Sequence, residues 1–315
     1  MPVSVQPASH ILLKTALSLL LLNAVSACHT SSGAVVDSSP VPIAKETVSE
    51  PTPAPIPDFS IVPYATEERP IKLDDKYIYG KAYIPKDDLE KHPTVILCHG
   101  IGNTLNDPSN FSMLFAERGI AAYAFDFCNG TENSQSSGDP LHMTVRTEAD
   151  DLNDVISFVQ QQEFVDTEHL FLLGQSQGGY VVTEVAHQRQ SELAGIILMY
   201  PAYNIPDLIN DYYPDLNAAP ETVTMYDVTV GKQYLLDAME EDIEQDMRSY
   251  KGKTLLLHGS NDPLVPIAYS MHAAETFPDA ELVTIEGAEH GFFLEDAMTA
   301  LDACLPFILS TYQKQ

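Results

Sequence analysis

One serine lies in a pattern that is typical of a covalent nucleophile. Ser176 is the centre of Gly174-Gln175-Ser176-Gln177-Gly178, between the apolar run His169–Leu173 and a segment of helical character. A serine at such a junction occupies a sharp, strained turn in which bulky neighbours would clash, and glycines avoid the clash. The turn would expose the hydroxyl and direct the N–H groups at the start of the helix toward a substrate. We therefore interpret Ser176 as a candidate nucleophile and the Gln177 N–H as a candidate donor to the reacting oxygen.

An aspartate and a histidine follow two later apolar runs. Asp262 comes shortly after Thr254–His258, between Gly259 and Pro263. A carboxylate at a strand end can fix the tautomer of an imidazole and stabilise the imidazolium. His290 follows Leu282–Ile285 in a loop and not on an apolar helix face. The chain order of serine, aspartate and histidine differs from that of chymotrypsin and of subtilisin.

A glycine-rich loop follows another apolar run. Thr94–Cys98 ends in His99-Gly100-Ile101-Gly102. Such a loop can bring a backbone N–H close to a substrate oxygen, and one donor of an oxyanion hole is worth roughly 3–4 kcal/mol. We expect Ile101 to supply this N–H together with Gln177, and His99 to bond loop backbone as a structural residue. The alternative is a tight turn beside a core histidine.

The elements that must position these residues alternate along the chain. The runs of strand length are Tyr77–Ile84, Thr94–Cys98, Ala121–Phe127, His169–Leu173, Gly195–Met199, Thr254–His258 and Leu282–Ile285. From Thr94 onward they are almost continuously apolar, as in parallel strands covered on both faces. Thr144–Gln161 has one apolar helical face. The order predicts an α/β fold: a mostly parallel, doubly wound sheet with helices on both faces and the site at the carboxyl ends of its strands.

The insert at residues 201–250 interrupts this rhythm. It is too long for a plain crossover, it is rich in Tyr and Asp, and its second half, Gln233–Tyr250, has a helical pattern. We expect a small cap over the site, although a partner-docking surface is an open alternative. Five tyrosines of the insert could stack on an aromatic acyl group or could provide only packing: Tyr203, Tyr212, Tyr213, Tyr226 and Tyr234.

The N-terminal segments have the composition of a targeting signal followed by a tether. Residues 16–27 are apolar, follow Lys14 and are too short to span a bilayer, which suits a signal peptide over residues 1–27. Val25-Ser26-Ala27-Cys28 resembles the lipobox of bacterial lipoproteins, which implies lipidation of Cys28; an ordinary cleaved signal peptide is the alternative. The residue after Cys28 is His29, which by the same resemblance points to the outer membrane. Residues 28–57, rich in Pro and Ser, are expected to be a tether, and residues 58–315 the folded domain.

The composition excludes several classes of protein. With 45 acidic and 16 basic residues among 315, the net charge is −29, so nucleic acid or anionic lipid headgroups would be repelled. We expect the acids, such as those of residues 148–154 and 237–246, to form a solvated surface. Besides Cys28 the chain has Cys98, Cys128 and Cys304, of which the first two could form a disulfide or remain buried thiols. No metal-ligand or phosphate-loop spacing is present, so no cofactor is expected.

From Lys76 to Tyr312 the chain resembles α/β-hydrolases, and within them the cinnamoyl/feruloyl esterase group. The matching pieces are VILCHGIGN, AYAFDFCNG, MTVRTEADDLNDVISFV, DIEQDMRSYKGKTLLLHGSNDPLVP and AYSMHAAETFPDAELVTIEGAEHGF. Two features depart from the group: Gln175 stands where His is usual, and Tyr203–Val230 follows no pattern of the relatives. In those relatives this region forms the cap that selects the acyl group.

The resemblance implies a serine carboxylic-ester hydrolase with a small-molecule ester substrate and the triad Ser176, Asp262 and His290. Feruloyl or cinnamoyl esters are the expected substrates. Serine aminopeptidase, acyl-lipid hydrolase and dienelactone-type activities of the same fold remain alternatives. A different class is a surface-binding lipoprotein that has the fold without the activity. The expected location is the cell envelope, with the membrane reached only through the lipid on Cys28.

Overall fold

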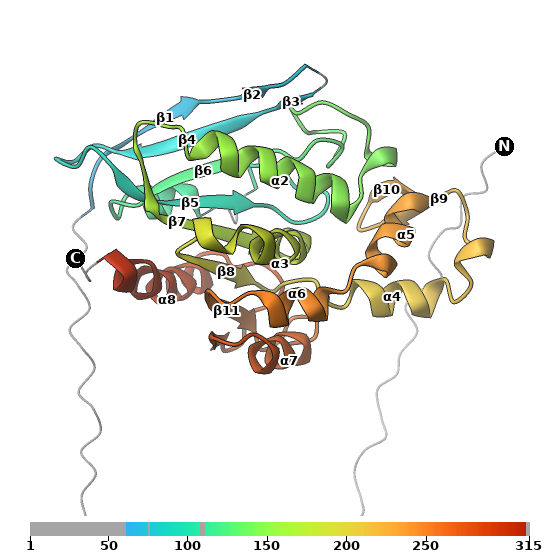
Figure 1. Cartoon of the computed structure of the whole chain (residues 1–315). Coiled ribbons are helices and arrows are strands. Elements are labelled where there is room, and N and C mark those ends of the chain that lie inside the picture. Colours follow the sequence, from blue (N-terminus) through green and yellow to red (C-terminus); the bar gives the residue numbers. More distant parts are fainter. Residues whose placement is uncertain (1–60, 75, 108–110, 313–315) are drawn as a thin grey trace, which may run out of the picture. The chain divides into compact units, whose positions relative to one another are not determined.

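A large sheet forms the centre of the computed structural model, which describes residues 61–312 except 75 and 108–110 (Figure 1). Its strands are β1 (Tyr64–Glu68), β4 (Gly80–Pro85), β5 (His92–Cys98), β6 (Ala121–Phe125), β7 (Val165–Gln175), β8 (Gly195–Met199), β11 (Lys253–Gly259) and β12 (Ala280–Ile285). They lie in the order β1-β4-β6-β5-β7-β8-β11-β12. β1 and β4 pair antiparallel, as do β4 and β6, whereas all pairs from β6 to β12 are parallel. The predicted mostly parallel sheet is confirmed.

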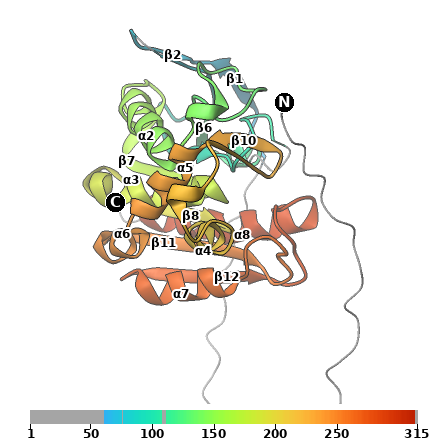
Figure 2. The ribbon, with the colours of Figure 1, turned by 90° about the vertical axis from the view of Figure 1, so that its right-hand side faces the viewer.

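Helices cover both faces of this sheet. One face carries α1 (Ser112–Ala116) and α8 (Glu295–Tyr312), and the other carries α2 (Val145–Val159), α3 (Gln177–Arg189), α6 (Ile243–Ser249) and α7 (Ala268–Thr276). In Figure 2, α2, α3 and α6 lie to the left of the strands and α8 to the right. Every residue of β5 and β6 is buried, which explains their continuous apolar character. No helix in the described part of the chain has both the length and the apolar character needed to cross a membrane.

The N-terminal part of the sheet differs from the expectation. The run predicted over residues 77–84 is divided between β3 (Tyr77–Ile78), which pairs with β2 (Ile71–Lys72), and β4. β1 was not predicted, because its sequence YATEE is short and polar, as suits a strand at the edge of a sheet. The other six predicted strands are all present, with ends that differ by a few residues.

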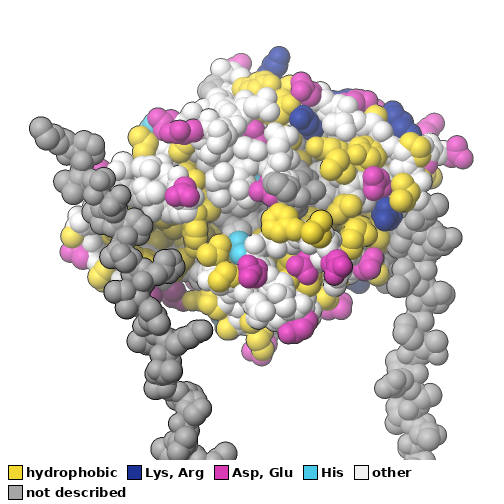
Figure 3. All heavy atoms as spheres, turned by 180° about the vertical axis from the view of Figure 1, so that it is seen from behind, with side chains coloured by type: hydrophobic (Ala, Val, Ile, Leu, Met, Phe, Trp, Pro, Cys, Tyr) yellow, Lys and Arg dark blue, Asp and Glu magenta, His cyan; other side chains and the backbone are white. Residues whose placement is uncertain are grey.

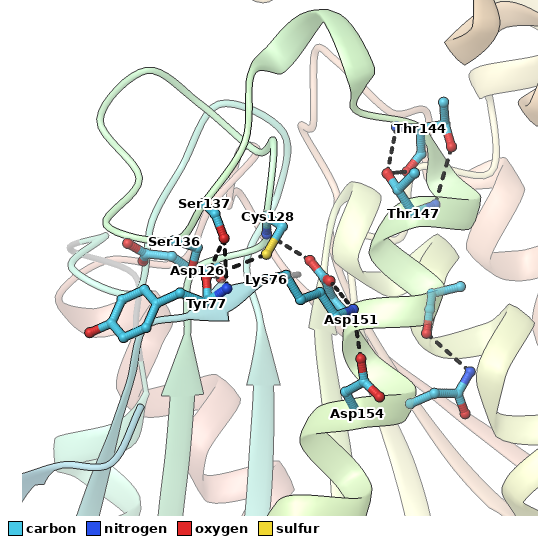
Figure 4. A network of polar contacts seen from close by, with 12 residues as sticks. Lys76, Tyr77, Asp126, Cys128, Ser136, Ser137, Thr144, Thr147, Asp151 and Asp154 are labelled. Atoms are coloured by element: carbon cyan, nitrogen blue, oxygen red, sulfur yellow. Dashed lines mark hydrogen bonds and ion pairs between the residues drawn. The ribbon is translucent and has the colours of Figure 1, made fainter. Parts of the chain in front are cut away.

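Polar contacts at the start and in the middle of α2 fix this helix beside the sheet (Figure 4). At its start, Thr147 N–H donates to Thr144 Oγ1 over 3.1 Å, and Thr144 N–H donates to Thr147 Oγ1 over 2.9 Å. Such reciprocal capping is worth about 1 kcal/mol. Further along, Asp151 accepts from Lys76 Nζ at 2.8 Å and from Cys128 N–H at 2.6 Å. These bonds connect α2 to the segment that enters β3 and to the loop after β6.

The acidic residues of α2 are not all solvated, which corrects the expectation for residues 148–154. Glu148 and Asp151 are each only 2 % exposed, and Asp237 of the insert is 6 % exposed. Other acids do lie at the surface, and acidic side chains are spread over the face shown in Figure 3 among few Lys and Arg. Part of the negative charge therefore has structural roles inside the domain.

The cysteines of the described domain are free thiols. Cys98, Cys128 and Cys304 are all buried, and no disulfide joins them. Cys98 ends β5 and Cys128 follows β6, so the predicted neighbourhood of the two strands holds, but the pair is not oxidised. Burial raises the pKa of the Cys128 thiol to about 12, which makes it a poor nucleophile.

The insert between β8 and β11 forms several short elements. They are α4 (Ile205–Tyr212), the hairpin strands β9 (Thr222–Met225) and β10 (Val228–Gly231), α5 (Lys232–Glu240) and α6. The predicted helix over residues 233–250 is two helices, because Asp242 caps the start of α6 by accepting from the Gln245 N–H. The predicted signal peptide, Cys28 and the tether lie outside the described residues.

Candidate active site

Ser176 occupies the strained turn that the sequence predicts, between the end of β7 and the start of α3. Its φ and ψ are 53° and −119°, which few residues other than glycine adopt. Its N–H donates to the Met199 carbonyl over 3.0 Å, and its carbonyl accepts from Gly179 N–H at 2.9 Å and from Ala202 N–H at 2.9 Å. These bonds from β8, α3 and the insert hold the turn in place.

Close backbone approach explains the two glycines of the turn. A Cβ on Gly174 would lie 2.3 Å from the Gly178 carbonyl oxygen, and a Cβ on Gly178 would lie 2.4 Å from that of Cys98. Both distances are far below van der Waals contact, so a side chain at either position would force the backbone apart. The glycines therefore let the turn pack directly against the end of β5.

The structure brings the predicted serine, histidine and aspartate together in one line. His290 Nε2 lies 3.0 Å from Ser176 Oγ, and His290 Nδ1 lies 2.8 Å from Asp262 Oδ2. The Asp262 side chain is fully buried, whereas that of His290 is 17 % exposed. This geometry allows a neutral imidazole to accept the serine proton at Nε2 while the carboxylate holds its Nδ1–H.

The surroundings of Asp262 keep its carboxylate ionised. Burial alone would raise its pKa, but hydrogen bonds from His258, His290 and the Val265 N–H outweigh burial and hold the pKa below its usual range. Its Oδ1 accepts from the N–H groups of Leu264 and Val265 at 2.8 and 2.9 Å. A fixed negative charge at this place is well suited to stabilise an imidazolium.

His258 supports Asp262 from behind, a role that the sequence did not indicate. It is fully buried at the end of β11, its Nε2 lies 2.9 Å from the Val265 carbonyl and 3.3 Å from Asp262 Oδ2, and its Nδ1 lies 2.7 Å from Ser270 Oγ. Two acceptors at Nε2 fit a ring that donates from Nε2. The aspartate is thus held by two histidines.

Tyr200 is a second supporting residue that the sequence did not indicate. Its ring centroid lies 4.7 Å from that of His290 and 4.8 Å from that of Phe292. Its hydroxyl accepts from Gln175 Nε2 over 3.0 Å. Gln175 stands where the cinnamoyl/feruloyl esterase group usually has His. Its hydrogen bond to Tyr200 therefore supports the aromatic ring that packs on His290.

The glycine-rich loop after β5 approaches Ser176 as expected. A Cβ on Gly100 would lie 3.1 Å from Ser176 Cβ, and Ile101 and Gln177 line the same cavity as Ser176. Gln177 is the first residue of α3, where a helix offers no internal acceptor for its N–H. The two residues predicted to supply the donors therefore lie in the wall of the cavity that also contains Ser176.

His99 is structural, as predicted. It is 6 % exposed, its Nδ1 donates to the Gly100 carbonyl over 2.8 Å and its Nε2 accepts from the Phe127 N–H over 3.3 Å. Burial lowers its pKa, which keeps the ring neutral. His99 thereby fixes the loop that carries Ile101.

A cavity of about 270 Å³ opens above Ser176 and His290. The insert supplies much of its wall, which is largely apolar: Ile101, Ala202, Ile205, Leu208, Met225, Leu264, Val265 and Phe293, with Tyr200, Tyr226 and Tyr234. Of the five tyrosines considered from the sequence, Tyr226 and Tyr234 line this cavity. Tyr203 is instead buried against Thr183, and Tyr212 is 75 % exposed.

The described residues contain no group of three or more His, Cys, Asp or Glu side chains arranged to hold a metal ion. The residues beside Ser176 are hydrogen-bonding and apolar groups. What they can do together is activate a hydroxyl, accept negative charge on a carbonyl oxygen and enclose an apolar group.

Comparisons with known proteins agree with the fold described above. A family model described as serine aminopeptidase S33 matches residues 90–233, and one described as the alpha/beta hydrolase fold matches residues 210–297. These matches support an α/β-hydrolase fold for the chain. Est1E from Butyrivibrio proteoclasticus, solved with ferulic acid bound, is similar to this chain with a TM-score of 0.72 and 22 % identity, over 78 % of this chain and 100 % of Est1E.

Two further proteins are similar to this chain. Alpha/beta hydrolase domain-containing protein 10 from mouse shares the fold with a TM-score of 0.62 and 16 % identity, over 78 % of this chain and 100 % of the mouse chain. An uncharacterized 31.7 kDa protein of the traX-finO intergenic region of Escherichia coli is 33 % identical over 109 residues. That match covers 34 % of this chain, which spans only 36 % of the relative's length.

Proposed function

We propose that this α/β-hydrolase is a serine carboxylic-ester hydrolase that forms an acyl-enzyme on Ser176. The observation that supports this proposal most strongly is the hydrogen-bonded line from Ser176 Oγ through His290 to Asp262, with distances of 3.0 and 2.8 Å. The line ends in a carboxylate held ionised and begins in a strained turn beside a cavity.

The proposed reaction has two matched halves. Ser176 Oγ attacks the ester carbonyl carbon while His290 Nε2 takes its proton, and the carbonyl electron pair moves to the oxygen held by the N–H groups of Ile101 and Gln177. The bond to the alcohol then breaks as His290 returns the proton to the leaving oxygen. Water attacks the acyl-enzyme in the same way, releases the acid and restores Ser176. Asp262 stays ionised throughout.

The residues of the cavity wall favour a substrate with a neutral, largely apolar acyl group. Among the described residues that line it there is no Lys or Arg, and Asp107 is the one carboxylate. A substrate with a free anionic group would therefore find no positively charged partner there. Tyr226 and Tyr234 offer aromatic faces for a feruloyl or cinnamoyl group, and the similarity of the fold to Est1E, solved with ferulic acid, is consistent with such esters.

A serine aminopeptidase is the second candidate, because the matching family model for residues 90–233 has that description. An aminopeptidase must bind the ammonium group of its substrate, and Asp107 is the carboxylate of the described wall that could do so. A wall with one carboxylate and many apolar side chains favours the ester.

A substrate panel tests this choice. Methyl ferulate, tributyrin and an aminoacyl-naphthylamide are each incubated with the wild-type chain and with Ser176→Ala, and the released acid or amine is measured. We expect hydrolysis of the two esters, faster for methyl ferulate, and little of the amide. Tributyrin as the best substrate would indicate an acyl-lipid hydrolase, and preferred cleavage of the naphthylamide would contradict the ester assignment.

The location of the enzyme is a separate proposal, since the residues concerned lie outside the described part. The lipobox-like Val25–Cys28 supports a lipoprotein of the cell envelope, anchored through Cys28 and held off the membrane by residues 28–57. Cells fed labelled palmitate should incorporate it into the wild-type protein and not into Cys28→Ala. Equal labelling of both, or of neither, would contradict the lipid anchor.

A further inference from the structure

A buried carboxyl group lies directly beneath the residue that follows the nucleophile. Glu148 of α2 is 2 % exposed, and its Oε2 accepts a hydrogen bond of 2.8 Å from Gln177 Nε2. The other end of the same amide, Gln177 Oε1, accepts from the Tyr234 hydroxyl of α5 over 2.6 Å. Tyr234 also belongs to the cavity wall. One buried hydrogen-bonded chain thus runs from α2, through the start of α3, to the insert.

These two hydrogen bonds hold the Gln177 side chain at both of its polar ends. The Gln177 residue is itself only 1 % exposed, so neither its amide nitrogen nor its amide oxygen could exchange a protein partner for water at low cost. The backbone N–H of the same residue is the donor that we assign to the substrate oxygen. Fixing the side chain therefore also fixes the direction of that N–H.

We propose that Glu148 is a positioning residue of the oxyanion hole, which acts through Gln177 in its neutral form and opposes the reaction once it is ionised. This inference rests on the proposed ester hydrolysis. Glu148 touches no reacting atom. A negative charge on its carboxyl group would lie one side chain away from the oxygen on which negative charge develops, within a buried, weakly screened environment.

The groups that face Glu148 support a neutral carboxyl group at pH 7. Burial raises its pKa to about 8, the hydrogen bond from Gln177 lowers it by less, and the charge of Asp151 on the same helix raises it. The Cys98 thiol of β5 and the Tyr234 hydroxyl of α5 have pKa values raised well above their ordinary ones by burial, so both stay neutral. None of these neighbours is a cation that would favour the carboxylate.

The chain offers a matched control in Glu184, which lies on α3. It is 7 % exposed, and burial raises its pKa to about 8 as well. The charges that raise the pKa of Glu184 further are those of Glu241, Asp246 and Asp150, and Gln177 is not among its neighbours. Replacing Glu184 with Gln removes a second buried acid of similar pKa and leaves the hydrogen bonds between Glu148, Gln177 and Tyr234 in place.

The test compares pH profiles of p-nitrophenyl butyrate hydrolysis from pH 6 to pH 10, followed at the isosbestic wavelength of p-nitrophenol. The proteins compared are wild type, Glu148→Gln, Glu148→Leu, Glu184→Gln and Ser176→Ala. The thermal unfolding of each protein is measured at every pH. We expect kcat of the wild type and of Glu184→Gln to fall above a pH of about 8, and that fall to move to higher pH in Glu148→Gln.

The Glu148→Leu variant separates the positioning role of the Glu148 side chain from the effect of its charge. We expect Glu148→Leu to lower kcat at pH 7 by about tenfold with little change in KM, because the Gln177 amide loses its carboxyl acceptor and keeps only the weak acceptor Met143 Sδ at 3.3 Å. We expect Glu148→Gln to recover most of that loss. If the alkaline fall of Glu148→Gln coincides with that of the wild type, or if glutamine and leucine reduce kcat equally, the inference is wrong. Hydrolysis that persists in Ser176→Ala would instead contradict the proposed function, so the two failures are distinguishable.

Discussion

Ser176→Ala is expected to lower kcat for p-nitrophenyl acetate and butyrate by about 10⁵-fold, because the acyl-enzyme cannot form without the Oγ nucleophile. Residual hydrolysis would come from substrate binding and the oxyanion donors alone. The fold should be unaffected, because the bonds that hold this turn involve the backbone N–H and carbonyl of residue 176 and not its hydroxyl. The stability change should therefore stay within about 0.5 kcal/mol.

The measurement is initial-rate kinetics on both esters, together with thermal unfolding of the same preparations. Purified wild type treated with a serine-directed inactivator serves as a control for contaminating esterases. Equal hydrolysis by wild type and Ser176→Ala would show that the serine has no part in the reaction. Loss of activity accompanied by a large drop in Tm would mean that residue 176 acts through the fold, which contradicts the account given above.

Asp262→Asn is expected to lower kcat by about 10⁴-fold while KM changes little. The amide can turn its NH₂ group toward His290 Nδ1, which would place the imidazole proton on Nε2, where it can no longer accept the proton of Ser176. The 2.8 Å bond between His290 Nδ1 and Asp262 Oδ2 and the full burial of the carboxylate make this site intolerant of the exchange. Steady-state kinetics at pH 7 to 8 measures the effect.

The same variant has a predicted signature in its pH-dependent stability. The pKa of Asp262 is lower in the folded chain than the ordinary value of about 3.9, so the ionised group stabilises the fold at all pH values above that range. This stabilisation is lost as the pH falls through the folded pKa. The Tm of wild type should therefore exceed that of Asp262→Asn at pH 7, and the difference should shrink below a pH of about 4. A difference that grows on acidification would contradict the assignment of an ionised, hydrogen-bonded carboxylate.

Much of the fold and the core of the site could be predicted, because their signals are local. Continuous apolar runs such as those of β5 and β6 occur where a strand is buried on both faces, and the structure buries them so. The glycines around Ser176 reflect contacts of 2.3 to 2.4 Å that any Cβ would make with the neighbouring backbone. Spacing and residue type therefore carried enough information to assign strand ends and the three residues that meet there.

The parts that escaped prediction depend on contacts between distant segments. Glu148 is expected to be solvated because it belongs to an acidic run, yet it shares the buried face of the helix with Val145 and Leu152. Its hydrogen-bond partner Gln177, which Tyr234 holds in turn, comes from a distant segment of the chain. The turn between β9 and β10 places Tyr226 and Asp227 at φ of 49° and 65°, where hairpins usually have glycine or asparagine. Without those residues the sequence carried no hairpin signal. No single stretch of sequence displays such relations.

The supporting residues behind the site follow the same rule. In the sequence, His258 is the last residue of an apolar strand, and Tyr200 is the residue between another strand and the insert. Their roles depend on tertiary contacts: Asp262 lies against His258, and the ring of His290 packs on Tyr200. The triad could be predicted from motifs, whereas the residues that hold it could not.

Labelling with a fluorophosphonate probe, followed by peptide mapping, tests the central claim most directly, because the probe reacts with an activated serine whatever the natural substrate is. We predict stoichiometric modification of Ser176 in the folded wild-type chain, much slower modification in Asp262→Asn and none at this position in Ser176→Ala. A folded wild-type chain that remains unmodified, or that is modified at another serine, would contradict the serine hydrolase and would favour a surface-binding protein with an unused hydrolase fold.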